Sequence, residues 1–163
     1  EDIEFVSRTL VFNLASAERV FAMVASCGAE MDTVFASDGD MLQEFWWDMI
    51  KARLLRAAEQ RLRETIHQVF RLGKTALMRP GSGDATVWPI QEQQKLFRLL
   101  GNVEGEIGVR LTASSLMLPN KTTSGLLFQT ESDFRSCQVC RRDPCPGRVA
   151  AFDPELWAAI EHE

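Results

Sequence analysis

The stretch MLQEFWWDMIKARLLRAAEQRLRETIHQVFR, residues 41–71, decides the fold, because it is the longest segment with one unbroken helical pattern. Its apolar side chains recur every three or four residues and so form one stripe along a helix. They are Trp46, Ile50, Leu54, Ala57, Ala58, Leu62, Ile66 and Val69. The other face is charged and carries Glu59, Arg61, Arg63 and Glu64. The pattern therefore predicts one long amphipathic helix.

The ends of this helix also have recognisable signals. Asp40, with Gln43 three residues later, resembles a capping box at the start. Gly73 suits the position just beyond the end. Trp46 and Trp47 are adjacent and must point to different faces, so we expect one in the core and the other exposed as a contact for a partner.

Shorter elements are predicted on both sides of the long helix. Before it come a helix at 7–14 capped by Ser7, a buried strand at 19–26, a helix at 29–36 and a turn at 37–40. After it come a strand at 74–79, a helix at 89–100, strands at 107–112 and 125–128, and a short helix at 153–157. A turn at 119–121 favours a hairpin-like pairing of the last two strands. The expected fold class is α+β, a mixed, largely antiparallel sheet covered by one long helix and shorter helices.

Length and composition restrict the possible functions. A chain of 163 residues fits a single domain, 1–163, with a substantial core. A net charge of -5 argues against a nucleic-acid partner, which would need a basic face. No apolar run approaches the roughly 18 residues of a membrane span. Four cysteines do not form a secreted disulfide scaffold, so a reducing cytoplasm is the expected location.

Three of those cysteines, Cys137, Cys140 and Cys145, lie within nine residues. A Cys-x2-Cys step lets two sulfurs turn toward one centre, which is typical of metal binding. We therefore expect a metal-binding segment at about 134–150, holding an iron–sulfur cluster or a structural zinc, with an unoccupied thiol loop as the other possibility. The fourth ligand is not evident, because Cys27 follows a buried-looking strand and is more typical of a core residue.

Several segments after the long helix form an ordered series with the cysteines. They are RPGSGD at 79–84, WPIQEQ at 88–93, LFRLL at 96–100, IGVRLT at 107–112, LMLPNK at 116–121, the pair SG at 124–125, and the cysteine segment ending at Arg148. The series, with the strand at 20–26, resembles the activation (reactivation) domain of cobalamin-dependent methionine synthase. It is most similar to the small stand-alone relatives that end in Cys-x2-Cys-x4-Cys-x2-Arg. The resemblance spans residues 7–148.

The resemblance implies a role in corrinoid chemistry, in a reactivation system for a cobalamin-dependent methyltransferase. The family returns stalled cob(II)alamin to use with an electron from a flavoprotein and the methyl group of S-adenosylmethionine. The resemblance implies that Arg79 pairs with the carboxylate of S-adenosylmethionine. It also implies that Gly81 and Gly83 let this ligand approach the loop backbone closely. Lys121 and Ser124, in the later matching segments, complete the implied cofactor-binding residues.

The chain also departs from the family pattern. Asp84 stands where an aromatic residue follows the loop glycine, the chain has no tyrosine, and the acidic ligand position falls near Arg56 or Glu59. Three alternatives stay open. The chain is an activation-like domain whose cysteine-ligated centre supplies electrons to a corrinoid protein, a non-catalytic docking module of a corrinoid methyltransferase with a structural zinc, or an S-adenosylmethionine-binding activation domain.

Overall fold

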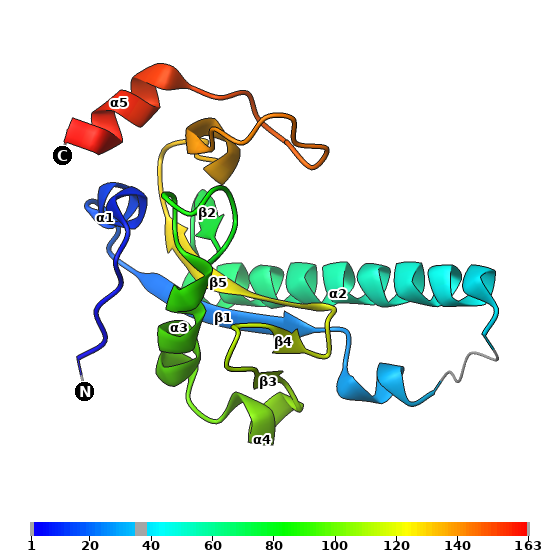
Figure 1. Cartoon of the computed structure of the whole chain (residues 1–163). Coiled ribbons are helices and arrows are strands. Elements are labelled where there is room, and N and C mark those ends of the chain that lie inside the picture. The colour runs from blue at the N-terminus through cyan, green and yellow to red at the C-terminus, as the bar shows by residue number, and fades with distance from the viewer. Residues whose placement is uncertain (1, 35–38, 163) are drawn as a thin grey trace.

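The computed structural model describes residues 2–34 and 39–162 and has the α+β architecture expected from the sequence. A three-stranded antiparallel sheet has the order β1-β5-β2, so the last of these strands in the sequence lies at the centre (Figure 1). In the register, Met23 of β1 faces Gly125 of β5, and Met78 of β2 faces Leu126 of β5. A separate two-stranded sheet joins β3 to β4.

The described helices and strands follow in this order. The first half contains α1 (Arg8–Leu14), β1 (Val20–Ser26), the 3-10 turn η1 (Ala29–Asp32), α2 (Met41–Phe70) and β2 (Thr75–Met78). The second half contains η2 (Ile90–Glu92), α3 (Gln93–Leu100), α4 (Val103–Ile107), β3 (Arg110–Leu111), β4 (Met117–Leu118), β5 (Thr122–Gln129), η3 (Ser136–Val139) and α5 (Pro154–His162).

The main core lies on one face of the three-stranded sheet. Its fully or almost fully buried members are Leu10, Met78, Val87, Trp88, Leu96, Phe128, Val139 and Ile160. They come from α1, α3, α5 and the loops as well as from the sheet, so the two ends of the chain close the same core. The long helix α2 packs on the opposite face of the sheet, where Phe70 of α2 contacts Phe21 of β1 at 4.7 Å between ring centroids.

Gly125 allows the central strand to form. A Cβ at this position would lie 2.3 Å from the carbonyl oxygen of Met78 on the neighbouring strand. No real Cβ tolerates such a distance, so only glycine lets β2 approach β5 this closely.

The long helix matches its expected start but differs at its end. The Asp40 carboxylate accepts the backbone N–H groups of Leu42 and Gln43, which confirms the predicted cap. The helix ends at Phe70, and Arg71 takes the left-handed conformation with φ 53°. The left-handed residue that ends the helix is therefore Arg71, two residues before the predicted Gly73.

The predicted apolar stripe of α2 is covered only in part, since Ala58, Leu62 and Ile66 in the second half of the helix are half-buried and the other members are exposed. Along α2, which is described over its whole length, no residue is buried. Trp46 and Val69 are 58% and 66% exposed. The first half of the helix runs past the end of the strands, so there is no sheet beneath that part of the stripe (Figure 1).

Two predictions about the strands after residue 100 were wrong. Residues 103–107 form helix α4, and Gly108, with φ 68°, ends it, so the strand begins only at Arg110. The expected hairpin of 107–112 with 125–128 does not form. The β3 strand instead pairs with β4, because the turn at 112–116 closes first, with the Thr112 amide donating to the Leu116 carbonyl at 2.8 Å.

The remaining elements agree more closely with the sequence. The helix at 7–14 is confirmed, with the Ser7 hydroxyl accepting the Leu10 amide at 2.9 Å. The helix expected at 29–36 is only a 3-10 turn over Ala29–Asp32 where the structure describes it, and residues 35–36, like positions 37–38 of the predicted turn, lie outside the described residues. The last helix reaches His162 instead of stopping near Trp157. Among the described residues, no helix is both long and apolar enough to cross a membrane.

Candidate functional site

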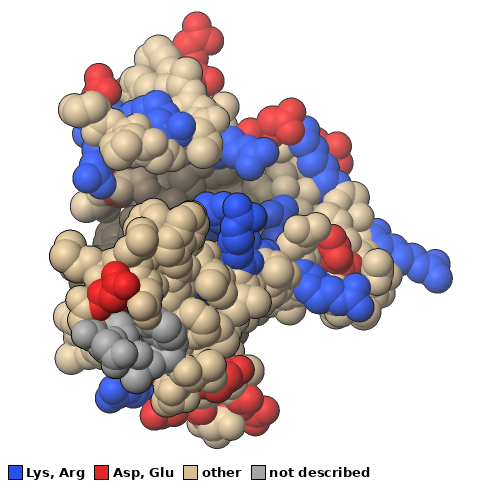
Figure 2. Space-filling model, turned by 90° about the vertical axis from the view of Figure 1, so that its right-hand side faces the viewer, with Lys and Arg blue, Asp and Glu red and all other residues tan. Residues whose placement is uncertain are grey.

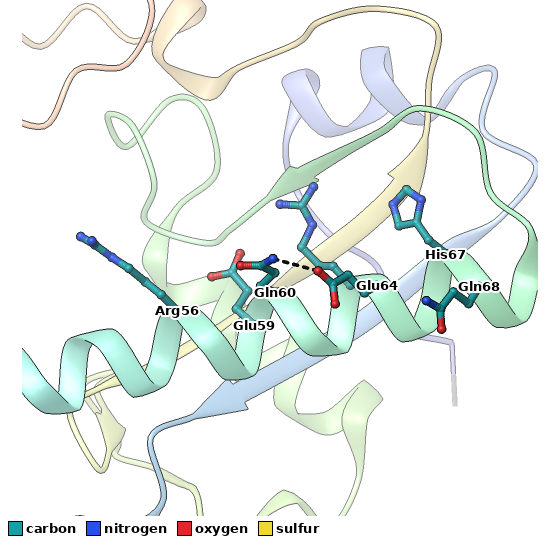
Figure 3. A pocket seen from close by; sticks show the side chains of 7 residues that line it. Arg56, Glu59, Gln60, Glu64, His67 and Gln68 are labelled. Atoms are coloured by element: carbon teal, nitrogen blue, oxygen red, sulfur yellow. Dashed lines mark hydrogen bonds between the residues drawn. The ribbon is translucent and has the colours of Figure 1, made fainter.

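A groove of about 700 Å³ runs along the second half of α2 (Figure 3). All of its lining residues come from that helix: Arg56, Glu59, Gln60, Arg63, Glu64, His67 and Gln68. In Figure 3 the Arg56 and His67 side chains rise above the helix, whereas Glu64 and Gln68 lie across its near side. The His67 ring nitrogen Nε2 lies 2.9 Å from the Thr75 hydroxyl, which ties this side of the helix to β2.

One lining residue of the groove, Glu59, is paired with the arginine that the sequence selects. Arg79 follows β2 directly, and its Nη2 donates to the Glu59 carboxylate at 2.5 Å. Its Nε donates to the Thr123 hydroxyl at 2.9 Å, so strand β5 fixes the guanidinium. The Glu59 side chain is 19% exposed and that of Arg79 is 36% exposed, so both remain in reach of a ligand. A carboxylate and a guanidinium side by side match the opposite charges of a free amino acid.

A second cleft, of about 410 Å³, adjoins this groove and shares Arg63 with it. It lies between β2 and the segment at 132–137, and its lining includes Arg79 and Cys137. The other cations of its wall are Lys74 and Arg135. Figure 2 shows a hollow on this side of the molecule with Lys and Arg side chains gathered along it. Arg79 and Cys137, far apart in the sequence, thus line one cleft.

The glycines of the loop contact the protein's own side chains. Gly81 and Gly83 have φ angles of 76° and 101°, which only glycine adopts easily. A Cβ on Gly81 would lie 2.6 Å from Ile90, and one on Gly83 would lie 3.0 Å from Val87. The loop therefore needs these glycines for its turn and its packing.

The last two predicted cofactor-binding residues lie elsewhere. Ser124 neighbours Thr123 on β5, and successive strand residues point to opposite faces, so Ser124 faces away from Arg79. Its hydroxyl is buried and has no hydrogen-bond partner among the described residues. Lys121 pairs with Asp48 of α2 at 2.8 Å, outside the lining of both hollows. The structure therefore brings together Arg79 and Cys137 but not Lys121 or Ser124.

The cysteine segment is organised around an arginine. Arg148 donates from Nη1 to the Cys137 carbonyl at 3.0 Å and from Nη2 to the Cys140 carbonyl at 3.2 Å. The same two nitrogens reach the carbonyls of Ala150 at 3.4 Å and Arg142 at 2.5 Å. One guanidinium thus satisfies four backbone acceptors that a loop would otherwise leave to water.

The thiols themselves do not fit a metal centre in this arrangement. Among the residues that the structure describes, no three His, Cys, Asp or Glu side chains come close enough to hold an ion. All four cysteines are free, and Cys140 is buried whereas Cys137 and Cys145 are half-buried. Burial, and then the nearby Asp32 carboxylate, raise the pKa of Cys27, which keeps it a neutral thiol and a poor ligand.

Asp84 connects the glycine loop to the cysteine segment. Its carboxylate accepts the backbone amide of Arg141 at 3.0 Å, across 57 positions in the sequence. It also accepts the Thr86 amide at 2.9 Å and the Thr86 hydroxyl. Partial burial opposes ionisation, but the hydrogen bonds from Thr86 and Arg141 outweigh it and lower the pKa of Asp84. The residue that departs from the family's aromatic pattern therefore holds the site's two segments together.

Sequence reasoning missed the partner of Arg79 and the role of Arg148. Helical periodicity places Glu59 on the polar face of α2, but no local signal indicates which strand that face meets. The family pattern gave the closer clue, because its acidic ligand position falls near Arg56 or Glu59. For Arg148, the fixed spacing from Cys145 was visible, but the four carbonyls around it depend on the path of the loop.

Comparison with protein families agrees with this arrangement. No curated protein sequence matches the chain. The family model described as the vitamin B12 dependent methionine synthase, activation domain, matches residues 14–146. That range includes β1, α2, Arg79, the glycine loop and all three clustered cysteines, so it covers both hollows and most of the chain. The chain therefore belongs to the family of vitamin B12-dependent methionine synthase activation domains.

Proposed function

We propose that this chain supports the reductive activation of a corrinoid cofactor carried by a cobalamin-dependent methyltransferase or its corrinoid protein. Membership in the activation-domain family supports a role in the B12 system. The observation that carries the finer proposal is the Glu59–Arg79 pair, because Glu59 lines a groove large enough for a small molecule and Arg79 lines the adjoining cleft. All four cysteines are free thiols, which a reducing compartment maintains, so the cytoplasm is the proposed location.

The ligand that fits the pair is the amino-acid end of S-adenosylmethionine. Its α-carboxylate suits the guanidinium of Arg79, and its α-ammonium suits the carboxylate of Glu59. The two side chains are paired with each other at 2.5 Å, so a zwitterion must compete with that ion pair to be received by them. In the proposed reaction, one electron from a reductant and the methyl group of the ligand convert cob(II)alamin to methylcobalamin, and S-adenosylhomocysteine leaves.

A reactivation assay tests this function directly. The cobalamin-carrying fragment of a cobalamin-dependent methionine synthase, loaded with cob(II)alamin, is mixed with reduced flavodoxin, S-adenosylmethionine and this chain. Cob(II)alamin has an unpaired electron, so its loss is followed by electron paramagnetic resonance. We expect the wild-type chain to speed that loss and Arg79→Ala and Glu59→Gln to slow it. Arg61→Ala, an exposed arginine of the same helix, is the matched control. A rate that is the same with and without the wild-type chain would refute the proposal.

Calorimetry separates ligand binding from reactivation. S-adenosylmethionine is titrated into the wild-type chain and into Arg79→Ala. Loss of a charge-assisted, bidentate partner weakens affinity by roughly tenfold or more, since such bonds contribute about 1.5–3 kcal/mol. If wild-type protein gives no heat of binding while reactivation still proceeds, the chain does not use this ligand.

A second candidate is a docking module that takes no part in the chemistry. The arrangement of the cysteine segment favours it, because Arg148 rather than a metal organises that loop. Metal analysis of anaerobically purified protein and its absorption spectrum distinguish the candidates. A stoichiometric iron–sulfur chromophore would support electron supply from the thiols, whereas stoichiometric zinc or a metal-free protein fits docking.

A further inference from the structure

The first half of α2 exposes an unusual number of large apolar side chains. We call them the apolar platform: Met41, Leu42, Phe45, Trp46, Met49, Ile50 and Leu54. Their exposed fractions range from 40% for Leu54 to 82% for Met41. The Phe45 and Trp46 rings contact each other edge to face, with centroids 5.7 Å apart, so they form a joined aromatic surface.

The exposed apolar area of the platform is larger than scattered single apolar residues on a protein surface would give. The neighbouring Trp47 is the residue that anchors the helix, since its indole donates to the Met31 carbonyl at 3.0 Å. Seven large side chains exposed to this degree amount to several hundred Å², a patch size that usually marks an interaction site. A standard interface buries roughly 800 Å² on each partner, so the platform supplies most of one.

The platform continues into the groove. Steps of four, seven and seven residues lead from Phe45 through Met49 and Arg56 to Arg63, and such steps stay on one side of a helix because they are close to whole turns. Arg56 and Arg63 line the groove together with Glu59, the partner of Arg79. A partner seated on the platform would therefore present whatever it carries at the entrance of the groove.

The charges on this side favour a partner that is not a second copy of the chain. Between residues 41 and 56 the only acids are Glu44 and Asp48. Glu44 lies three residues after Met41 and so stands at the edge of the platform, and Asp48 pairs with Lys121. The exposed cations Arg53 and Arg56 lie on the platform side. Two copies would bring apolar and cationic surfaces together with only Glu44 at the edge to match the cations, whereas an acidic partner complements them better.

We propose that the apolar platform is the docking surface for a protein whose contact face has an apolar centre and carboxylates toward Arg53 and Arg56. This inference rests on the proposed function, which makes that protein the corrinoid carrier. Docking on the platform sets the corrinoid opposite the groove, so one helix receives the partner with its first half and the small ligand with its second.

Binding measurements with exposed-residue variants test this surface. The probe is the cob(II)alamin-loaded, cobalamin-carrying fragment of a methionine synthase, titrated against the full chain. We expect Phe45→Ser with Trp46→Ser to weaken the dissociation constant by at least about tenfold, as central aromatic residues of interfaces do. Val69→Ser, 66% exposed at the other end of α2, is the matched control and should bind like wild type. Circular dichroism and an unchanged Tm confirm that the variants fold.

A charge reversal tests the acidic character of the partner. Arg53→Glu should weaken binding severalfold, mainly through slower association, and the loss should shrink at high salt. Arg61→Glu, at an exposed arginine about two helical turns beyond Leu54, the last platform residue, should leave both the affinity and its salt dependence unchanged. Equal effects of the two reversals would reject the proposed charge match and overturn the assignment.

The outcomes separate this inference from the proposed function. If wild-type protein speeds cob(II)alamin loss but the serine double variant binds and acts like wild type, the platform assignment fails and the function stands. If the wild-type chain neither binds the probe nor speeds that loss, both fail. A second copy of this chain is the remaining possible occupant of the platform, and sedimentation over a range of concentrations tests for it. A dimer that the Trp46→Ser substitution dissociates would overturn the assignment. Binding lost in the double variant and kept in Val69→Ser supports it.

Discussion

At the scale of single residues, Asp84 shows how one side chain joins distant parts of the site. Its carboxylate holds the Arg141 amide, which belongs to the cysteine segment. We expect Asp84→Asn to lower the free energy of unfolding by on the order of 1–3 kcal/mol, because hydrogen bonds to an ionised acceptor are lost or weakened. Urea denaturation measures the change. Asp143→Asn, an exposed aspartate of the same segment, should be close to neutral.

The lowered pKa of Asp84 also predicts a pH dependence. A carboxyl whose pKa falls on folding stabilises the native state above its ordinary value of 3.8, and this contribution is lost as pH falls through the lower folded-state pKa. The stability difference between wild type and Asp84→Asn should be constant from pH 7 to roughly 5 and shrink below about 4. A difference that grows on acidification would show that the pKa shift has the opposite sign.

The four thiols should differ in their reactivity. Cys27 and Cys140 are buried, and burial together with the Asp32 carboxylate raises the pKa of Cys27. Iodoacetamide on native protein at neutral pH should therefore label Cys137 and Cys145 first, as read by peptide mass spectrometry. All four should react once the protein is denatured. Native labelling of Cys27 at the rate of Cys145 would show that the strand end opens readily.

Residues whose role is local were predictable from the sequence, and residues whose role depends on a distant segment were not. The caps by Ser7 and Asp40 follow from a hydroxyl or carboxylate meeting amides two or three residues away. Ser124 looked equivalent to Arg79 because both lie in matching segments. The structure separates them because strand parity, which depends on the register between β2 and β5, sends them to opposite faces.

At the scale of elements, the contact between β2 and β5 depends on one missing side chain. We expect Gly125→Ala to cost on the order of 3 kcal/mol or more, since its methyl group would meet the Met78 carbonyl at 2.3 Å. Thermal denaturation should show a large fall in Tm. Gly147→Ala is the control, because a Cβ there would meet no atom within 4 Å. Equal Tm changes for Gly125→Ala and Gly147→Ala would mean that β2 and β5 can move apart without a loss of stability.

The cysteine segment should depend on Arg148 as a unit. We expect Arg148→Lys to loosen residues 137–150 because an ammonium cannot reach four carbonyls arranged for a planar fork. Amide hydrogen exchange should increase for η3 and the loop that follows, while β5 stays protected. Arg142→Lys, an exposed neighbour that contributes its carbonyl rather than its side chain, should leave exchange unchanged.

The elements themselves were predicted unevenly. The long helix was visible because its pattern spans many turns, whereas the strand expected at 107–112 begins with the last residue of α4 and reduces to Arg110–Leu111. Ile107 and Val109 look like strand residues, but the Asn102 side chain caps a short helix by accepting the Gly105 amide at 3.1 Å. Periodicity correctly grouped the residues of the α2 stripe on one face. It could not report whether anything covers that face.

At the scale of the whole molecule, the two ends of the chain complete one core. Helix α5 lies beside α1, where the Arg8 guanidinium donates to the Glu161 carbonyl at 3.2 Å and Ile160 is 2% exposed. We expect Ile160→Ala to cost about 2–5 kcal/mol through the cavity it leaves. Ile107→Ala, at 44% exposure, should cost far less. Chemical denaturation of both variants measures the difference, and similar losses would mean that α5 is not part of the cooperative core.

The α+β class was predictable from composition and pattern, but the strand order was not. Local signals favoured a hairpin between neighbours in the sequence, yet β5 pairs with β1 and β2, which both precede it by dozens of residues. Those pairings are chosen by the apolar faces that they bury together, a property of the complete chain.

The central position of the last sheet strand has a consequence during synthesis. Until residue 129 has left the ribosome, β1 and β2 have no partner, because each of them pairs only with β5 in the described structure. At roughly 5–20 residues per second, β1 waits unpaired for several seconds or more. A nascent chain in that condition offers a hydrophobic strand edge to other nascent chains, so protection by chaperones during translation should matter more for this protein than its modest size suggests.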